Sequence, residues 1–522
     1  MIYPIVLGVL LGAPWGLSFS PIQFWWLGLL QLLVLLVLLN TRYFAHSIPR
    51  VFAFAWSFGA CGLGLGVSWL YISLHVYGEL PALLAVLSVF GFALYLGLFA
   101  ALSAMAWVSC RRESSASWVP CWNAFLWAAF WSFFEWFRGY FLTGFAWLSL
   151  GDSLVDSPFS GLLPWLGNHG ALFFVLWVGS ALVLIIMRSP KSIQIKPVMP
   201  VFCLIGVMAL FLFNKPETRE VDEFKLVGIQ PNVQQDIKFD PTFILNNMKK
   251  VFQLGDMGLA VLPNEGALIF PETVNPLLWQ NSPKRWLVRF RDYAAHREGV
   301  VITGAAIEDQ GLHFNSVVLF DGSESDDQLV TPSKRHDKRH LVPFGETIPF
   351  GFKWFVSLLN MPMGEFHPGS GALKPLLSQG NALAATICYE DTFSGEFASL
   401  VRQAEQEPTL LLNLSNLAWF DQSWALDQHA QMGRVRSAEH QKPTIRVTNT
   451  GVSGVISAEG QWLKRVPAWE DQVWQASVHG RIGLTPYAQF GHWFYLFIWG
   501  LPLLLLLCRL LAIWPYNKRV II

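Results

Sequence analysis

Charged residues are scarce in this chain, and the scarcity is uneven. Only 14% of its 522 residues are Asp, Glu, Lys or Arg, whereas soluble domains carry roughly 25%. Residues 1–213 hold only 13 of the charged side chains. With 53% hydrophobic residues, a disordered chain and a wholly soluble enzyme are excluded. Because Lys+Arg and Asp+Glu balance at 36 each, electrostatics gives no reason to expect a nucleic-acid partner.

Cysteine is also rare. The chain has six cysteines, and only Cys388 lies between residues 216 and 488. A domain with a single cysteine cannot be closed by an internal disulfide. Taken alone, Cys388 could be a small buried hydrophobic side chain or a nucleophile. Its surroundings in the sequence are needed to choose between these two interpretations.

Long apolar runs, by contrast, are abundant. A spanning helix needs about 20 mostly apolar residues, and we expect about eight such helices. They lie near residues 2–20, 22–39, 51–73, 82–109, 118–134, 162–187, 197–213 and 489–513. The first run has no basic start and no small-residue cleavage site, so we interpret it as a retained helix and not as a signal peptide.

Lys and Arg in the short loops predict the orientation of these helices, because cytoplasmic loops carry an excess of them. The loops after the first, third and fifth runs hold only Arg138. The loops after the second, fourth and sixth runs and the C-terminal tail hold Arg42, Arg50, Arg111, Arg112, Arg188, Lys191, Lys196, Lys518 and Arg519. We therefore expect a multi-pass membrane protein with both termini in the cytoplasm and the domain between the last two runs outside, which in a bacterium is the periplasmic face of the inner membrane.

The charge distribution divides the chain into three parts. We predict a membrane segment of seven helices over residues 1–215, an exported catalytic domain over 216–488, and an eighth helix with a cytoplasmic tail over 489–522. Within the third run, Gly59, Gly62, Gly64 and Gly66 favour close helix packing over a groove that admits lipid. Glu135 and Arg138, at the end of the fifth run, are either functional or an interfacial ion pair.

The exported segment alternates strand-like and helix-like patterns, which is typical of a layered α/β domain. Helical patterns lie near residues 242–257, 284–297 and 426–441. We expect strands at Phe224–Gln230, Ala267–Phe270, Val300–Ala306, Ser316–Phe320, Ala382–Cys388, Thr409–Ser415, Thr444–Thr448 and Val452–Ser457.

Three chemically useful residues each follow a strand-like run. Glu272 alone could be a turn carboxylate or a helix cap, and Lys338 alone could belong to a solvated basic strip or one that touches lipid headgroups. Together with Cys388 they form the order Glu, Lys, Cys, each at a strand-to-loop transition. Their segments are Leu268–Thr273, Lys338–Glu346 and Thr386–Glu390.

This order resembles the nitrilase (carbon–nitrogen hydrolase) superfamily, whose Glu-Lys-Cys triad lies on an αββα sandwich. With the membrane helices added, the whole chain resembles the apolipoprotein N-acyltransferases. The string His340–Glu346 is the most discriminating feature, because soluble nitrilases are not expected to carry it in full. Further family-like motifs lie at Gly144–Trp147, Gly228–Asn232, Ser415–Phe420 and Thr485–Tyr487.

The resemblance implies a reaction and roles. Cys388 would take an acyl chain from a membrane glycerophospholipid, typically phosphatidylethanolamine, and pass it to the α-amino group of the diacylglyceryl-cysteine of an apolipoprotein. Glu272 would be the general base, and Lys338 would stabilise the oxyanion. Glu346, Tyr389 and Glu390 would support the site, and Phe239, Asn416, Trp419, Phe420 and Trp147 would contact substrate. We expect no cofactor and a monomer.

Two positions depart from the family pattern, and rival functions stay open. Phe239 stands where Trp is expected, and Leu417 stands where Asp is usual, which removes a carboxylate. The first rival is a membrane-tethered amidase that transfers the acyl group to water. Another is a transporter with an exported regulatory domain, which would require charged residues at mid-membrane. A catalytically dead relative is disfavoured by the intact triad. No convincing metal-ligand set is visible around His336 and His340.

Overall fold

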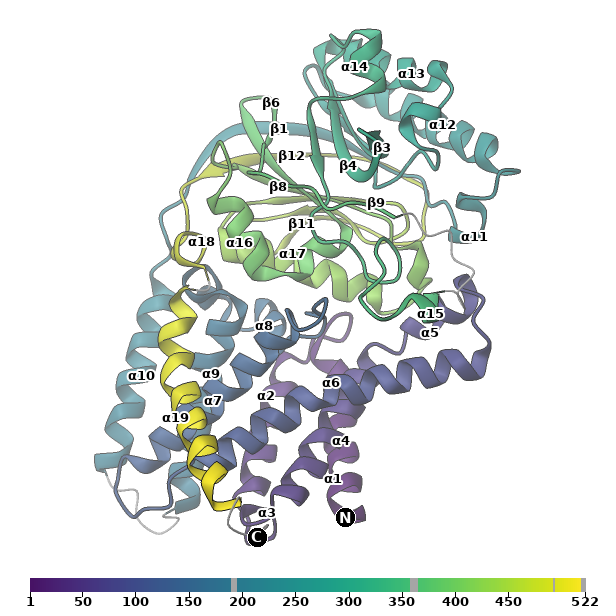
Figure 1. Cartoon of the computed structure of the whole chain (residues 1–522). Coiled ribbons are helices and arrows are strands. Elements are labelled where there is room, and N and C mark those ends of the chain that lie inside the picture. Colours follow the sequence, from purple (N-terminus) through teal and green to yellow (C-terminus); the bar gives the residue numbers. More distant parts are fainter. Residues whose placement is uncertain (189–194, 357–364, 492, 518–522) are drawn as a thin grey trace. The chain divides into compact units, whose positions relative to one another are not determined.

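The computed structural model describes residues 1–188, 195–356, 365–491 and 493–517 (Figure 1). It divides into two compact units. The helical unit comprises Met1–Ser68, Val86–Lys215 and Phe490–Ile522, and the sheet unit comprises Trp69–Ala85 and Pro216–Gln489. Among the residues used above to predict orientation, Lys191, Lys518 and Arg519 lie outside the described residues.

Apolar helices make up the helical unit. Four of those described are long and apolar enough to cross a membrane: Ile48–Gly66, Ala82–Cys110, Ser160–Arg188 and Trp493–Leu511. Shorter apolar helices cover Ile2–Ser18, Trp25–Leu39 and Val201–Phe213. The main elements are α1 (Ile2–Gly12), α2 (Trp25–Leu39), α4 (Ile48–Gly66), α6 (Ala82–Cys110), α7 (Val119–Arg138), α9 (Leu163–Arg188), α10 (Ile195–Phe213) and α19 (Trp493–Asn517). The count of eight spans stays a prediction.

The glycines of α4 lie at helix contacts. A Cβ added at Gly59 would come within 2.7 Å of the Cβ of Ala100 on α6, and one at Gly62 within 2.8 Å of the Cβ of Trp15. Real Cβ atoms do not approach so closely, so glycine is what lets these backbones pack together. The prediction of close packing is confirmed.

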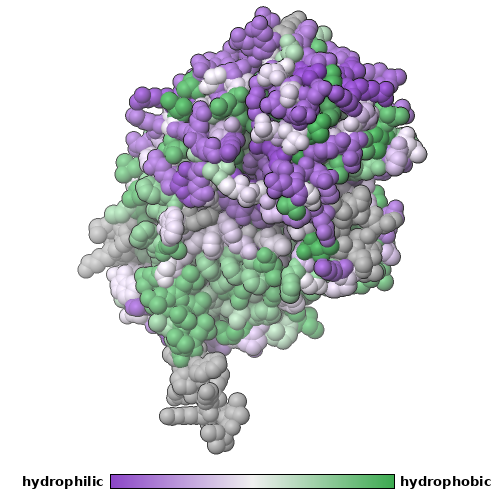
Figure 2. Space-filling view, turned by 45° about the horizontal axis from the view of Figure 1, so that its top comes forward, coloured by the Kyte–Doolittle hydropathy of each residue, from purple (hydrophilic) through white to green (hydrophobic). Residues whose placement is uncertain are grey.

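The outer surface of the helical unit is apolar. Large hydrophobic side chains are exposed on α6, α10 and α19, among them Leu87, Phe90, Phe202, Leu210 and Phe497. Figure 2 shows hydrophobic side chains gathered over the helices, whereas the surface of the sheet unit is largely hydrophilic. An apolar surface of this extent is what a helix bundle presents to lipid.

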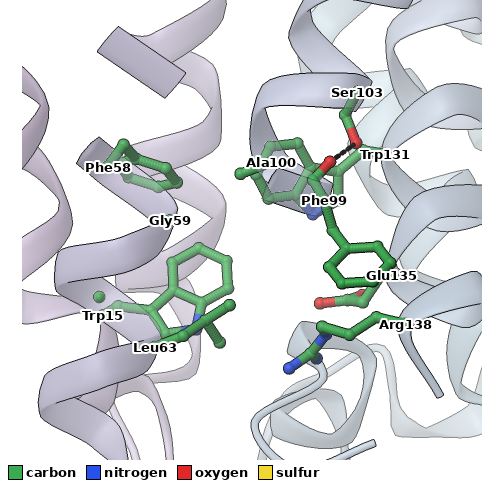
Figure 3. Close-up of a pocket in the computed structure, with 11 residues that line it drawn as sticks. Trp15, Phe58, Gly59, Leu63, Phe99, Ala100, Ser103, Trp131, Glu135 and Arg138 are labelled. Atoms are coloured by element: carbon green, nitrogen blue, oxygen red, sulfur yellow. Dashed lines mark hydrogen bonds between the residues drawn. The ribbon is translucent and has the colours of Figure 1, made fainter. Parts of the chain in front are cut away.

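The helical unit also buries charge. Glu135 and Arg138 point from α7 into a pocket whose opposite wall carries Trp15 and Leu63 (Figure 3). Oε1 of Glu135 accepts a hydrogen bond from the amide of Leu150 at 2.8 Å. Nη1 of Arg138 donates to the carbonyl of Trp147 at 2.8 Å. Both side chains therefore hold the loop that follows α7.

The sheet unit contains two six-stranded sheets. The first has the order β12-β1-β2-β3-β4-β5 and the second β11-β10-β9-β8-β7-β6. The first comprises β1 (Arg219–Gln230), β2 (Ala267–Ile269), β3 (Val300–Asp309), β4 (Leu312–Phe320), β5 (Arg335–Asp337) and β12 (Gln472–Ile482). The second comprises β6 (Leu376–Ser378), β7 (Asn381–Ile387), β8 (Leu410–Ser415), β9 (Thr444–Thr448), β10 (Ser453–Ile456) and β11 (Trp462–Val466).

Alternation along the strands builds the layers, because successive side chains of a strand point to opposite faces. In β2, Ile269 packs between the sheets with Leu412 of β8, whereas Leu268 packs on the opposite face with Phe252 of α12. Helices α12 (Ile244–Val261) and α13 (Lys284–Ala295) cover the first sheet. Helices α16 (Ser394–Arg402) and α17 (Ala425–His440) cover the second (Figure 1). The predicted αββα sandwich is confirmed.

A segment from the first hundred residues belongs to the sheet unit. Trp69–Ala85 connects α4 to α6 and contains the short α5 (Leu70–Ile72). The indole N–H of Trp69 donates to Oε1 of Gln428 at 3.1 Å, and the ring lies 4.6 Å from that of Phe420. The hydroxyl of Ser73 donates to the carbonyl of Trp419 at 2.8 Å. The sequence patterns did not indicate this association.

Candidate active site

Glu272 lies in the loop that leaves β2. A Cβ at Gly304 on the neighbouring β3 would come within 2.5 Å of the Cα of Glu272. Only glycine therefore lets the loop pass this close to the strand. The close passage holds the carboxylate at the C-terminal end of β2, where its side chain is 8% exposed.

Both carboxylate oxygens of Glu272 are hydrogen-bonded. Nδ2 of Asn315, on β4, donates to Oε1 at 2.8 Å. The backbone amide of Asn416, just after β8, donates to Oε2 at 2.6 Å. One donor comes from each sheet, so the carboxylate is fixed at the place where the two sheets meet. Two hydrogen bonds of this kind fix the orientation of the carboxylate.

Lys338 follows β5 directly and is 1% exposed. Its Nζ lies 2.9 Å from Oε2 of Glu346 and 3.6 Å from Oε1 of Glu272. Burial works against its charge, but Glu346, Glu272 and Cys388 more than offset that cost and raise the pKa of Lys338. Lys338 is therefore a fixed ammonium group and not a base.

Cys388 is the first residue after β7. Its φ of +50° lies in the left-handed region, which a residue with a Cβ adopts at some cost. Burial, followed by the charge of Glu272, raises the pKa of the thiol, while Lys338 lowers it. The thiol is thus neutral at rest, and its proton has to leave as it attacks.

Glu390 joins the two loops that carry Cys388 and Lys338. Its Oε2 accepts from the amide of Ile387 at 2.7 Å, and its Oε1 accepts from the amide of Arg339 at 2.8 Å. Burial opposes its charge, but His336, whose Nε2 lies 3.6 Å from Oε2, and these two amides lower the pKa of Glu390. Tyr389 is 8% exposed, and its ring packs edge-on against the ring of Phe393.

The predicted substrate contacts fall in different places. Asn416 lies at the base of the site through its bond to Glu272. Phe239 follows α11 (Gln235–Lys238) and is half-buried, as are Trp419 and Phe420 in the loop after β8. Trp147 belongs to the helical unit, where it is buried.

Lys238 is a second buried lysine that the sequence analysis missed. Its Nζ lies 3.5 Å from the carbonyl oxygen of Glu272, and its side chain is 3% exposed. Burial lowers the pKa of Lys238 to about 8, although Glu272 and Cys388 act in the opposite direction. Its position in the sequence could have identified it, because Lys238 directly precedes Phe239, which the sequence analysis had named as a substrate contact.

Asn315 was also missed, because a single Asn inside a strand carries no motif. Its Nδ2 donates both to Oε1 of Glu272 and to Oε1 of Glu346, at 2.8 and 2.7 Å. It therefore holds the two carboxylates on either side of Lys338. A polar residue at a buried position of a strand is the signal that could have identified it.

Leu417, which replaces an expected carboxylate, is fully buried. Its Cδ1 would lie 2.6 Å from a Cβ at Gly451, so it fills space against that glycine. Asn416 supplies polar contacts beside it: its Nδ2 donates to Oε1 of Gln235, and its Oδ1 accepts from Asn449. The loop therefore keeps its hydrogen bonds without the missing carboxylate.

This arrangement can carry out acyl transfer. A half-buried thiol lies near a hydrogen-bonded carboxylate that can accept its proton, and near an ammonium that can stabilise an oxyanion. Glu346 pairs with Lys338 more closely than Glu272 does. Within the described residues, no group of three or more His, Cys, Asp or Glu side chains is placed to hold a metal.

Comparisons with known proteins cover nearly the whole chain. The family described as apolipoprotein N-acyltransferase N-terminal domain matches residues 11–181, and that described as carbon–nitrogen hydrolase matches residues 233–487. The apolipoprotein N-acyltransferase of Ralstonia nicotianae is 35% identical over 489 residues, which cover 93% of this chain and 90% of that protein. The chain belongs to the apolipoprotein N-acyltransferases.

Other relatives agree with this family. The apolipoprotein N-acyltransferase of Bordetella bronchiseptica is 34% identical over 508 residues, which cover 92% of each chain. Separately, among solved structures, a carbon–nitrogen hydrolase of Helicobacter pylori aligns with 49% of this chain and 89% of its own chain, at 16% identity and a TM-score of 0.36. The chain thus combines apolar helices with a match to the carbon–nitrogen hydrolase family.

Proposed function

We propose that this protein transfers a fatty acyl chain from a membrane glycerophospholipid to the α-amino group of the N-terminal diacylglyceryl-cysteine of apolipoproteins. The observation that carries the proposal is the cluster of Glu272, Lys338 and Cys388 in a chain that matches the family over nearly its full length. The apolar surface of the helical unit supports it too, because both substrates are anchored in lipid.

The first half of the reaction acylates the enzyme. The sulfur of Cys388 attacks the ester carbonyl carbon of the phospholipid while Glu272 takes the thiol proton. The carbonyl oxygen becomes an oxyanion beside Lys338. When the intermediate collapses, the carbon–oxygen bond of the ester breaks, and the departing lysophospholipid oxygen takes the proton from Glu272. The products are a Cys388 thioester and a neutral alcohol.

The second half transfers the acyl group to nitrogen. The free α-amine of the acceptor attacks the thioester carbon, and Glu272 takes a proton from that nitrogen. The carbon–sulfur bond breaks, and Glu272 returns the proton to the sulfur of Cys388. An amide is formed and the enzyme is regenerated. Lys338 stays charged throughout, in keeping with its raised pKa.

The membrane arrangement belongs to the same proposal. The protein has eight spans, cytoplasmic termini and a periplasmic catalytic unit in a bacterial inner membrane, and it acts as a monomer with phosphatidylethanolamine as donor. The boundaries are residues 1–215, 216–488 and 489–522, with Trp69–Ala85 joining the catalytic unit. Phe239, Asn416, Trp419, Phe420 and Trp147 contact substrate, and Glu346, Tyr389 and Glu390 support the triad.

One experiment tests the two halves separately. Purified protein is given phospholipid without an acceptor, and the mass of the peptide that holds Cys388 is measured for an added acyl group. A diacylglyceryl-cysteine peptide is then added, with the N-acetylated peptide as the matched control. The free amine should discharge the thioester and gain the acyl chain, whereas the acetylated amide has no nucleophilic lone pair. Equal discharge with both peptides would mean that water is the acceptor and that the protein is an amidase.

A further inference from the structure

His429 lies behind the nucleophile, on α17. The ring is fully buried. Its Nε2 lies 2.9 Å from the carbonyl oxygen of Cys388, and its Nδ1 lies 2.8 Å from Nη2 of Arg446. The imidazole therefore connects a buried guanidinium to the main chain of the residue that carries the thiol. None of the proposed steps of acyl transfer uses His429.

The partners of the ring determine where its proton lies. A guanidinium only donates hydrogen bonds, so Nδ1 must accept from Arg446. The proton of the neutral ring is then on Nε2, which donates to the carbonyl of Cys388. Burial lowers the pKa of His429 well below its usual value, and the positive charges of Arg446 and Lys338 add to that effect. The ring is a neutral donor across the working pH range.

Arg446 is itself held in place. Its Nη1 lies 2.6 Å from Oδ2 of Asp391, whose Oδ1 accepts from the hydroxyl of Thr386 at 3.0 Å. Asp391 and Thr386 flank Cys388 in the sequence. The line of contacts from Asp391 through Arg446 and His429 thus returns to the nucleophile, and it begins and ends within one short stretch of chain.

This contact matters because of the backbone at Cys388. The residue is left-handed, with a φ of +50°, and such a conformation persists only where its surroundings hold it. Among the described contacts, the other donor to its carbonyl is Nδ2 of Asn413, at 3.5 Å. The peptide group is planar, so a hydrogen bond that holds the carbonyl also holds the backbone dihedral angle ψ of Cys388. The backbone in turn sets the direction in which the side chain leaves the chain.

We propose that His429 is a positioning residue for acyl transfer, which holds the carbonyl of Cys388 so that the thiol faces Glu272 and Lys338. The inference rests on the proposed function for the identity of the substrate, whereas the contact between His429 and Cys388 does not depend on that function. It predicts that the hydrogen bond from the Nε2 position is what the reaction needs, and that a polar side chain that cannot reach Cys388 does not replace it.

Two amide substitutions separate reach from polarity. In His429→Gln the amide nitrogen can occupy the Nε2 position and donate to Cys388, whereas in His429→Asn the side chain is too short. We expect the Gln variant to acylate within about 3-fold of wild type, and the Asn variant to lose about 100-fold in kcat with KM for phospholipid nearly unchanged, as for a misplaced reacting group. If the Asn variant does not fold, His429→Met removes the donor at similar volume.

His440 provides the matched control. It lies on the same helix, is equally buried, and packs against the rings of Phe397 and Tyr487, 5.1 and 6.1 Å away. His440→Asn should lower the melting temperature as His429→Asn does, but it should leave the kcat of the folded protein within about 2-fold, because it does not contact Cys388.

Alkylation of Cys388 by iodoacetamide, followed by mass spectrometry, serves as the second readout. This assay needs no lipid. It therefore tests the role of His429 even if wild-type protein forms no thioester from phospholipid, which would contradict the proposed function. We expect the Asn variant to alkylate at least about 5-fold faster than the Gln variant at pH 8, since a thiol that has turned away from Glu272 loses the charge that, after burial, does most to raise its pKa. Equal behaviour of the Gln and Asn variants in both assays would overturn the role of His429.

Discussion

The two units both bury charged side chains, but they use them differently. In the helical unit, Glu135 and Arg138 bind main-chain atoms, the amide of Leu150 and the carbonyl of Trp147. In the sheet unit, Lys338 binds the carboxylates of Glu346 and Glu272, which lie close to a thiol. Both groups are almost fully buried, so burial alone does not distinguish them.

The difference lies in the partners. A main-chain amide or carbonyl does not change its charge, so a side chain that binds it holds a loop in place. Ionisable side chains that bind one another can exchange protons, and each of them shifts the pKa of its neighbours. An ionisable residue in a helix bundle is often taken as functional by default. The bonds from Glu135 to the amide of Leu150 and from Arg138 to the carbonyl of Trp147 give both residues an anchoring role.

Removing the nucleophile should have the largest effect. Cys388→Ala should form no acyl adduct and release no lysophospholipid, while folding at a cost of only about 1–2 kcal/mol, since one sulfur at a strand end is lost. Cys61→Ala, in the helical unit, is the matched control and should acylate like wild type. Adduct formation in Cys388→Ala, measured by mass spectrometry, would assign the thioester to another residue.

Replacing the base should come next. Glu272→Gln should slow acylation by about 10³-fold, as for the loss of a general base, because the amide cannot accept the thiol proton. Glu346→Gln should slow it less, since that carboxylate holds Lys338 and does not take the proton. Single-turnover release of lysophospholipid measures both variants. An equal or larger loss at Glu346 would show that the base is assigned to the wrong residue.

Replacing each of the two buried lysines should slow acylation by different amounts in the same assay. Lys338→Met should slow acylation by about 100-fold or more, as for the loss of one oxyanion donor. Lys238→Met should cost less, because its nearest described partner is the backbone carbonyl of Glu272. The exposed Lys249 is the control, and Lys249→Met should change nothing. If Lys238→Met slowed acylation more than Lys338→Met, the oxyanion contact would be reassigned to Lys238.

The charge of Glu272 should affect thiol reactivity in the opposite direction to catalysis. Glu272 raises the pKa of Cys388, so Glu272→Gln should lower it and increase the thiolate fraction. Alkylation by iodoacetamide at pH 8 should therefore become faster, by about 3-fold or more, while acylation becomes slower. In wild type, the alkylation rate should still be rising above pH 9. A plateau near pH 8.5 would mean that the thiol is not perturbed.

The smallest effect on catalysis should come from the helical unit. Glu135→Gln keeps an acceptor for the amide of Leu150, so acylation per folded molecule should stay within about 2-fold. Stability should fall by about 1 kcal/mol, because an amide NH2 group takes the place of a buried carboxyl oxygen. Thermal unfolding in detergent measures this fall. A loss of acylation without a loss of stability would make Glu135 part of the catalytic machinery.

Much of the sheet unit was predictable because its strands bury both faces and so read as short apolar runs. All eight predicted strands are present, and Thr444–Thr448 has the predicted bounds. The strands that were missed are β5, β6, β11 and β12. Those such as Trp462–Val466 carry exposed charged residues and have no continuous apolar face. Edge strands of this kind resemble loops in a sequence.

The site was predictable as far as its residues follow strands in a family-like order. Glu272, Lys338 and Cys388 lie where strand ends meet. Asn315 and His429 were not predictable in the same way, because each acts through a contact across more than 25 residues. A single polar residue inside a strand or helix shows its role only when the fold brings its partner to it.

The association of Trp69–Ala85 with the sheet unit has a consequence for how the protein is made. Ser73 and Trp419, whose contact joins the segment to the loop after β8, are separated by 346 residues. At about 5–20 residues per second, the ribosome needs about 20–70 s to supply the second partner. During that time the segment is already attached to both α4 and α6, so insertion of these helices comes before completion of the catalytic unit. A fragment that begins at Pro216 would lack one wall of its own fold.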